Sequence, residues 1–203
     1  MKHASALIAK WLLKAGAISA EKVDLYEYAI YSFLFSSFPL LVVICLGAVF
    51  HMVLEGVVMI APFMLIRKFS GGFHLKSSIV CTISSITLLS LSLILIRLIS
   101  VYNQLALFTA FVLLFALSVF FNSPIDSEER KLSPKEVIFF RKICRGMLLV
   151  FLIIYIALLF FQSGYWAISI GMGIILTSLL QIPCIAVKIF RQFQQKGLAV
   201  KEK

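Results

Sequence analysis

A histidine and a cysteine stand seven residues apart in the segment RKFSGGFHLKSSIVC, residues 67–81. His74 can act as a general base toward Cys81, because a thiolate attacks a carbonyl carbon once a base or nearby positive charge favours its formation. Arg67, Lys68 and Lys76 supply positive charge around the pair. The segment is therefore a candidate site for catalysis by a cysteine nucleophile.

The spacing of the pair restricts how it can work. If residues 74–81 were all helical, the two Cα atoms would be roughly 10.5 Å apart at about 1.5 Å per residue. Reacting groups must approach to about 2.6–3.2 Å between heavy atoms. We therefore expect His74 on a loop folded back by Gly71 and Gly72, whose backbones reach angles closed to other residues. Cys81 should then lie in the first turns of the next helix.

Two other features of the pair stay open at this point. An interfacial polar histidine and a small, buried cysteine would be the simple structural interpretation of the same residues. No residue that would orient His74 is visible, because no Asp or Glu lies between Glu55 and Asp126. A carboxylate from elsewhere in the fold, a backbone carbonyl, Ser77 or Ser78 fits this role equally.

The composition indicates that a bilayer surrounds these residues. Of the 203 residues, 62% are hydrophobic and 14% are charged, and the mean hydropathy is +1.05. Soluble domains are nearer to half apolar and about a quarter charged. We therefore exclude an ordinary soluble enzyme and expect an all-α, polytopic membrane bundle that forms a single domain over residues 1–203.

The net charge of +10 does not indicate nucleic acid as a partner, because the basic residues form short clusters between apolar runs. Such clusters are typical of the flanks that orient a membrane protein. The four cysteines fit neither a zinc spacing nor a small disulfide scaffold, and we expect free thiols, no metal and no cofactor. They are Cys45, Cys81, Cys144 and Cys184.

Apolar runs of about 20 residues mark the expected crossings. Residues 29–66 form one long run, enough for two short helices, and further candidates are residues 77–96, 101–121, 146–161 and 165–187. This predicts about six transmembrane helices, or four with a re-entrant pair before Arg67. The expected parts are an amphipathic N-terminal region (1–28), helical pairs at 29–66, 77–121 and 146–187, loops at 67–76 and 122–145, and a basic tail (188–203).

The distribution of lysine and arginine orients these parts. Basic residues gather in the N-terminal region, the loop at 67–76, the loop at 122–145 and the tail, whereas the intervening turns carry none. Because cytoplasmic loops are enriched in lysine and arginine, we expect both termini and the candidate catalytic loop on the cytoplasmic side.

Three polar features have mainly structural interpretations. Ile8, Trp11 and Ile18 share one face of an expected interfacial helix whose lysines favour anionic lipid. His51 and Glu55 lie one helical turn apart, and either a pair within the membrane or simple exposure at an outer turn fits them. The serines and threonines of residues 77–92 favour close helix packing over a polar substrate path.

The motif RKFSGGFH, with a cysteine seven positions after the histidine, resembles the accessory gene regulator B (AgrB) family. This family consists of membrane cysteine endopeptidases that process peptide pheromone precursors in Gram-positive bacteria. The segment NSPIDSEERKLSPKE (residues 122–136) resembles the family's proline-containing basic loop, and LLQIP (residues 179–183) resembles its usual last-helix ending. The resemblance covers nearly the whole chain, and it departs at Leu75, where many members have alanine.

The resemblance implies a function and assigns residues to it. His74 and Cys81 would be the catalytic pair of an enzyme in the bacterial cytoplasmic membrane. Its substrate would be an AgrD-like precursor peptide, whose tail is removed through a thioester acyl-enzyme to give a cyclic thiolactone for quorum sensing. A homodimer is also implied. The family's functionally important arginine and glycine would fall on Arg67 and Gly72. From the charge and the glycine pair of the segment itself, Lys68, Gly71 and Lys76 are also expected to shape the site or bind substrate, with Arg130, Lys131 and Lys135 for the acidic tail.

Two alternative functions come from other classes. In a small multi-span transporter, the sequence SGGF would be a break between half-helices, and inverted internal repeats would be expected. In a non-catalytic membrane scaffold, Cys81 would serve packing alone. The chain shows no convincing internal repeat, which weighs against the transporter.

Overall fold

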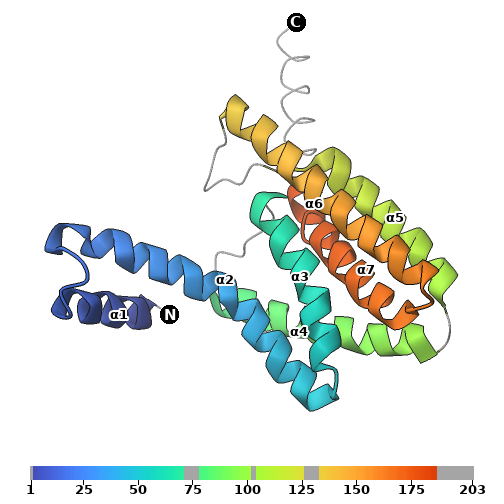
Figure 1. Cartoon of the computed structure of the whole chain (residues 1–203), viewed down its shortest axis with the longest axis horizontal. Coiled ribbons are helices and arrows are strands. Elements are labelled where there is room, and N and C mark those ends of the chain that lie inside the picture. The colour runs from blue at the N-terminus through green and yellow to red at the C-terminus, as the bar shows by residue number, and fades with distance from the viewer. Residues whose placement is uncertain (1, 71–77, 102–103, 126–132, 187–203) are drawn as a thin grey trace, which may run out of the picture.

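A computed structural model of the chain describes residues 2–70, 78–101, 104–125 and 133–186 (Figure 1). These residues form helices and contain no strand, which confirms the all-α prediction. The helices are α1 (Lys2–Lys14), a short 3-10 turn (Ala20–Lys22), α2 (Val23–Phe50), α3 (Val53–Ser70), α4 (Ser78–Val101), α5 (Leu105–Asn122), α6 (Pro134–Phe160) and α7 (Gly164–Leu179).

Helix α7 forms the centre of the bundle. Of its apolar window, 61% of the residues are buried, against 12–22% in the other candidate membrane spans. It packs against α3, α4, α5 and α6. In Figure 1, α3, α5 and α6 run beside α7, whereas α4 runs obliquely to them. The core therefore lies around the helix that comes last among those described.

Two glycines allow other elements to approach α7 closely. A Cβ atom at Gly173 would overlap the Met59 carbonyl oxygen of α3 and would lie 2.5 Å from Pro62 Cγ. A Cβ at Gly171 would lie 2.7 Å from Val112 Cγ2 of α5. Small residues at such contacts let membrane helices pack through their backbones, where lipid offers no hydrophobic driving force.

The expected run at 29–66 is divided at His51 into α2 and α3. His51 ends α2 in the left-handed conformation (φ 56°), and its backbone N–H donates to the Gly47 carbonyl. Histidine is among the residues that tolerate this conformation. His51 is exposed and Glu55 is half-buried in the first turn of α3, so the structure places them at the turn between two helices.

The N-terminal helix is shorter than expected. It ends at Lys14, and Gly16 follows with a positive φ of 69°, the usual way to terminate a helix, so Ile18 does not belong to it. Ser5 and Ala9 are buried, and α1 packs mainly against α2. Trp11 stays 66% exposed, as an interfacial helix requires. Helix α1 and the first half of α2 extend away from the bundle (Figure 1).

Helix α6 begins 12 residues before the expected residue 146, within the stretch assigned to the basic loop. The helix starts early because of a capping signal in the polar residues before the apolar run at 146–161. Ser133 accepts a hydrogen bond from the Glu136 N–H, the Glu136 carboxylate accepts one from the Ser133 N–H (2.8 Å), and Pro134 occupies the first helical position. This capping box starts a helix in a polar segment.

Five of the described helical stretches are long and apolar enough to cross a membrane. Helix α3 has 18 residues but carries Glu55 in its first turn and Arg67 and Lys68 in its last. Helix α2, with 28 residues, is too long for half of a re-entrant pair. The outward faces of these helices carry many exposed large apolar side chains. The chain is a multi-pass membrane protein.

Candidate functional site

The candidate catalytic segment joins two helix ends. Arg67 and Lys68 lie in the last turn of α3, and Cys81 is the fourth residue of α4. The structure describes the backbone of Cys81 but not its side chain, and Gly71, Gly72, His74 and Lys76 lie outside the described residues, as do Arg130 and Lys131. The predicted place of Cys81 in the first turn of a helix agrees with the backbone, whereas the approach of His74 stays a prediction.

Arg67 is held at the end of α3 by packing and electrostatics. Its guanidinium lies over the ring of buried Phe63, 5.4 Å from the centroid. It is also close enough to the thiol of Cys184, beyond α7, for an electrostatic interaction. A cation in the last turn of a helix is stabilised by the helix dipole. The Arg67 side chain is therefore held in place and remains half-exposed next to the candidate segment.

Lys68 differs from its neighbour. Its side chain is exposed, and Nζ lies 5.8 Å from the centroid of the Phe69 ring. Phe69 in turn packs against Phe140 of α6, with centroids 6.0 Å apart. Lys68 thus presents a positive charge to the surroundings of the site without being fixed by a buried contact.

Two hydroxyl groups of α4 bond within their own helix. Thr87 Oγ1 donates to the Ile83 carbonyl (3.0 Å), and Ser92 Oγ donates to the Leu88 carbonyl (2.7 Å). A hydroxyl satisfied by its own backbone offers little to a polar substrate. At Thr87 and Ser92, the structure therefore favours packing over a polar substrate path.

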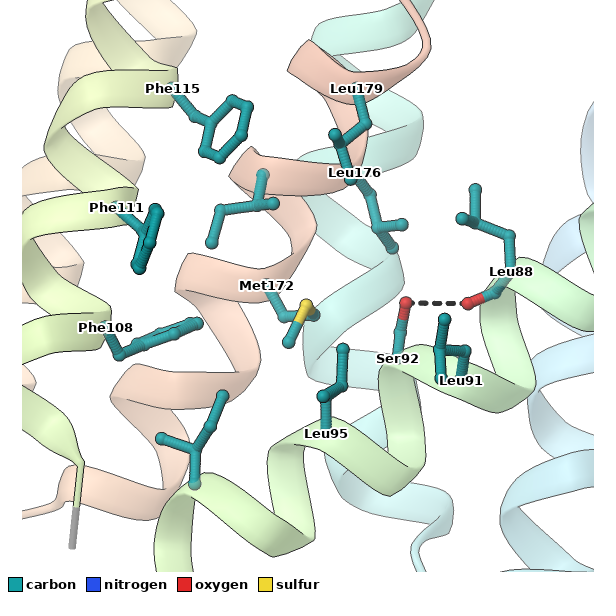
Figure 2. Close-up of a pocket in the computed structure, with 12 residues that line it drawn as sticks. Leu88, Leu91, Ser92, Leu95, Phe108, Phe111, Phe115, Met172, Leu176 and Leu179 are labelled. Atoms are coloured by element: carbon teal, nitrogen blue, oxygen red, sulfur yellow. Dashed lines mark hydrogen bonds between the residues drawn. The ribbon is translucent and has the colours of Figure 1, made fainter.

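A groove of about 310 Å³ lies between α4, α5 and α7. Figure 2 shows its apolar and aromatic lining, with the Ser92–Leu88 hydrogen bond at one wall. The α4 positions that line it include Leu88, Ser92, Leu95 and Ile99. Cys81 occupies the register position seven residues before Leu88, so the two positions share a face of the helix. The face of α4 on which position 81 lies therefore continues into the apolar lining of this groove.

Helix α6 displays a basic face near its start. Lys135, Arg141 and Lys142 are exposed. Arg145 Nε donates to the Phe120 carbonyl at the end of α5 (3.2 Å), and its guanidinium lies 4.4 Å from the centroid of the Phe120 ring. Of the three residues expected to bind an acidic tail, the structure describes Lys135 alone, and it lies on this face.

A buried polar cluster beside the end of α3 was not predicted. Gln181 Nε2 donates to Ser123 Oγ (2.9 Å), and both side chains are buried. Among the described atoms, Gln181 Oε1 and Ser178 Oγ are buried without a hydrogen-bond partner. The Ile125 N–H donates to the carbonyl of Ser70, which is also buried. A glutamine inside an apolar run was the available signal, since polar groups in membranes are costly unless they serve a purpose.

The sequence profile of the family accessory gene regulator B matches residues 5–185, a range that contains α2–α7 completely and α1 from Ser5 onward. The chain belongs to this family. AgrB membership agrees with the helical, multi-pass structure and with the motif between α3 and α4.

One curated relative, "Putative AgrB-like protein 2" of Clostridium perfringens, is 30% identical to this AgrB-family chain over 86 residues. The match covers 42% of this chain and 40% of the relative, so it spans less than half of either protein. No solved structure matches the chain.

Proposed function

We propose that this AgrB-family protein is a membrane cysteine endopeptidase that removes the C-terminal tail of an AgrD-like precursor and forms a cyclic autoinducing peptide. The observation that carries the proposal is the place of Cys81, in the first turn of α4 and seven residues after the histidine of the RKFSGGFH motif. The positive end of a helix dipole acts within the first turn and stabilises a thiolate there.

In the proposed first step, His74 removes the proton from the Cys81 thiol, and the sulfur attacks a backbone carbonyl carbon of the precursor. The C–N bond breaks, the imidazolium gives its proton to the departing amine of the tail, and a thioester acyl-enzyme remains. In the second step, an internal cysteine of the precursor transfers its proton to His74 and attacks the thioester. Cys81 leaves as a thiolate and regains a proton from the imidazolium.

The second step exchanges one thioester for another, so ring closure needs no external energy source. Water competes with the internal thiol for the acyl-enzyme. The apolar surface of α4 beyond Cys81, formed by positions such as Leu88 and Leu95, limits the access of water. A membrane-edge site of this kind favours cyclisation over hydrolysis.

The positive charge near the site supports the proposal that the segment cleaved from the precursor is acidic. Arg67 and Lys68 lie in the last turn of α3, and Lys135, Arg141 and Lys142 lie on the basic face of α6. Cations clustered at one end of a bundle attract an anionic peptide through their summed field. We assign the tail to these groups, with Arg130 and Lys131 as further candidates in the same stretch of sequence.

The test follows precursor cleavage in membranes that contain wild-type protein, Cys81→Ala or Cys81→Ser. We expect both variants to lose tail release, and we expect His74→Ala to do the same, since the thiolate and its base are both required. Cys45→Ala is the matched control, because Cys45 is an exposed thiol on α2 and should leave cleavage unchanged. Wild-type rates in Cys81→Ala would contradict the peptidase and favour a transporter or scaffold.

A further inference from the structure

Arg145 of α6 is held in place by two contacts with the end of α5. Its Nε donates to the Phe120 carbonyl (3.2 Å), and its guanidinium carbon lies 4.4 Å from the centroid of the Phe120 ring. A guanidinium carries five N–H donors. Among the described residues, the Phe120 carbonyl is the acceptor for Nε alone, so the four donors of the two terminal nitrogens remain available to a ligand.

Arg145 lies at the edge of the apolar part of the bundle. Residues 146–161 contain no charged side chain, and neither does α5. Helix α6 has 27 residues and is therefore about 40 Å long, whereas the hydrocarbon core of a bilayer is about 30 Å thick. The start of α6 extends beyond that core, and Arg145 is the first cation after the uncharged stretch. Its guanidinium therefore lies near the level at which the lipid headgroups begin.

The side chains next to this guanidinium are apolar and exposed. Leu149 follows Arg145 by one helical turn and is 51% exposed. Phe121, whose ring lies 5.4 Å from the Phe120 ring between centroids, is 70% exposed. On the outer surface of a multi-pass membrane protein, such side chains contact lipid tails, which are as apolar as leucine. A ligand that reaches Arg145 here must therefore combine a negative charge with apolar chains.

The surrounding helices supply little negative charge. Helices α5, α6 and α7 contain one acidic residue, Glu136, whose carboxylate accepts from the Ser133 N–H. Glu136 precedes Arg145 by nine residues, about 13.5 Å along the helix axis. Two further cations, Arg141 and Lys142, are exposed one turn before Arg145. Because a charged side chain at membrane depth is costly unless it is paired, this positive region favours an anion from outside the protein.

Arg145 lies on a different side of α6 from the end of α3. Phe140 packs against Phe69 of α3, whereas Arg145 contacts Phe120 of α5, and α5 and α6 run side by side (Figure 1). Positions five residues apart are about 140° apart around a helix. Arg145 therefore faces α5 and the lipid beside it, away from the helix end that leads into the candidate catalytic segment.

We propose that Arg145 binds the phosphate of an anionic phospholipid, in the leaflet that the positive-inside rule predicts to be cytoplasmic. Its terminal nitrogens form a fork that matches two phosphate oxygens, Phe120 holds this fork in place, and Leu149 and Phe121 contact the acyl chains. The neighbouring exposed cations repel the ammonium group of a zwitterionic headgroup, so a headgroup with a net negative charge is favoured. This lipid site does not depend on the proposed peptidase function.

The experiment measures which lipid stays bound to the full-length protein. Native mass spectrometry from mixed micelles with equal amounts of phosphatidylglycerol and phosphatidylcholine gives the ratio of the two bound lipids. We expect the wild type to retain phosphatidylglycerol preferentially and Arg145→Ala to lower this preference about tenfold. Arg145→Lys keeps the charge without the fork and should lie between them. Phosphatidylglycerol should also raise the Tm of the wild type but not that of Arg145→Ala.

Lys135→Ala is the matched control. It removes the same charge from the same helix, but Lys135 precedes Arg145 by ten residues, about 15 Å along the axis. The lipid preference should therefore change less than about twofold. Phe120→Leu is a second variant, needed if Arg145→Ala does not fold. It keeps the backbone carbonyl and removes the ring, and the preference should fall about threefold.

Two soluble competitors identify the source of the negative charge. Glycerol 1-phosphate presents the headgroup chemistry without acyl chains, and a glutamate-rich peptide presents carboxylates. Neither should displace phosphatidylglycerol from the wild-type protein, because neither can contact the apolar side chains beside Arg145. Displacement by glycerol 1-phosphate would make this a site for a soluble phosphate, and displacement by the peptide would assign Arg145 to a peptide ligand instead.

Two further outcomes would overturn the lipid site. An unchanged lipid ratio in folded Arg145→Ala would mean that the guanidinium has a structural role alone. Equal losses in Arg145→Ala and Lys135→Ala would reduce the effect to net charge, without a specific site. None of these measurements requires precursor cleavage, so their failure would leave the proposed peptidase function untouched.

Discussion

Arg67 shows how one side chain can serve both the fold and a reaction. Its guanidinium lies over the Phe63 ring and near the Cys184 thiol, and the end of α3 stabilises its charge. A planar guanidinium can stack on a ring and still bind a carboxylate with its edge, which an ammonium group cannot do. The neighbouring Lys68 has the same charge without this fixed geometry.

This difference predicts unequal effects of substitution at the two positions. Arg67→Lys keeps the charge but loses the planar guanidinium that lies over the Phe63 ring, and we expect kcat/KM for tail cleavage to fall about tenfold, equivalent to about 1.4 kcal/mol. Lys68→Arg should change it less than twofold, because an exposed cation contributes little through any one geometry. Steady-state cleavage assays in proteoliposomes provide the measurement. Equal effects at both positions would mean that charge alone matters.

At the scale of helices, the close contact between α3 and α7 helps to position the end of α3, where the candidate catalytic segment begins. Gly173 lets the α3 backbone at Met59 approach α7 directly, and α3 continues from there to Arg67 and Ser70. The position of the α3 end therefore depends on a contact about two turns away along the helix. Helix α6 carries Gly146, but a Cβ there would meet nothing within 4 Å.

These two helical glycines form a matched pair for substitution. Gly173→Ala should lower the free energy of unfolding by about 2–4 kcal/mol, because the added methyl group forces two packed backbones apart. Gly146→Ala should be neutral or raise it by up to about 1 kcal/mol, since alanine favours helix more than glycine. Denaturant titration in mixed micelles measures both. A harmless Gly173→Ala would show that α3 and α7 do not need this close contact.

At the scale of the whole molecule, the alternation of basic and uncharged connections predicts the orientation of the chain in the membrane. Lys135, Arg141 and Lys142 lie near the start of α6, whereas Gln104, the N-cap of α5, lies in a connection without lysine or arginine. The positive-inside rule places these two regions on opposite sides of the membrane. We expect the proposed catalytic segment to lie on the same side as Lys135.

Labelling of single cysteines tests this orientation. In protein whose four native cysteines are replaced by serine or alanine, Gln104→Cys should react with a membrane-impermeant maleimide added to intact cells. Lys135→Cys should react only after the membrane is permeabilised. Both side chains are exposed, so access through the bilayer decides the result. Labelling of Lys135→Cys in intact cells would place the basic face of α6 outside and contradict a cytoplasmic site.

The sequence predicted the structure correctly where the hydrophobicity of long segments determined it. It predicted the all-α helical class, which the described residues confirm. The sequence analysis did not predict helix ends that short polar signals determine, or contacts between residues far apart in the chain. The Ser133–Glu136 capping box extended α6 into the expected loop, and Gly16 ended α1 early. The meeting of Gln181 with Ser123 joins residues 58 apart, and no periodicity indicates such a contact.

The burial of α7 has a consequence for how the protein is made. Helices that enter the bilayer one after another can pack only against those already present. Helix α7 packs against α3, α4, α5 and α6. Before α7 is inserted, the surfaces of these helices that will contact it therefore face lipid. A ribosome that has delivered only α2–α6 has therefore inserted helices that still lack their shared packing partner, and the core around α7 forms only when synthesis has passed residue 179.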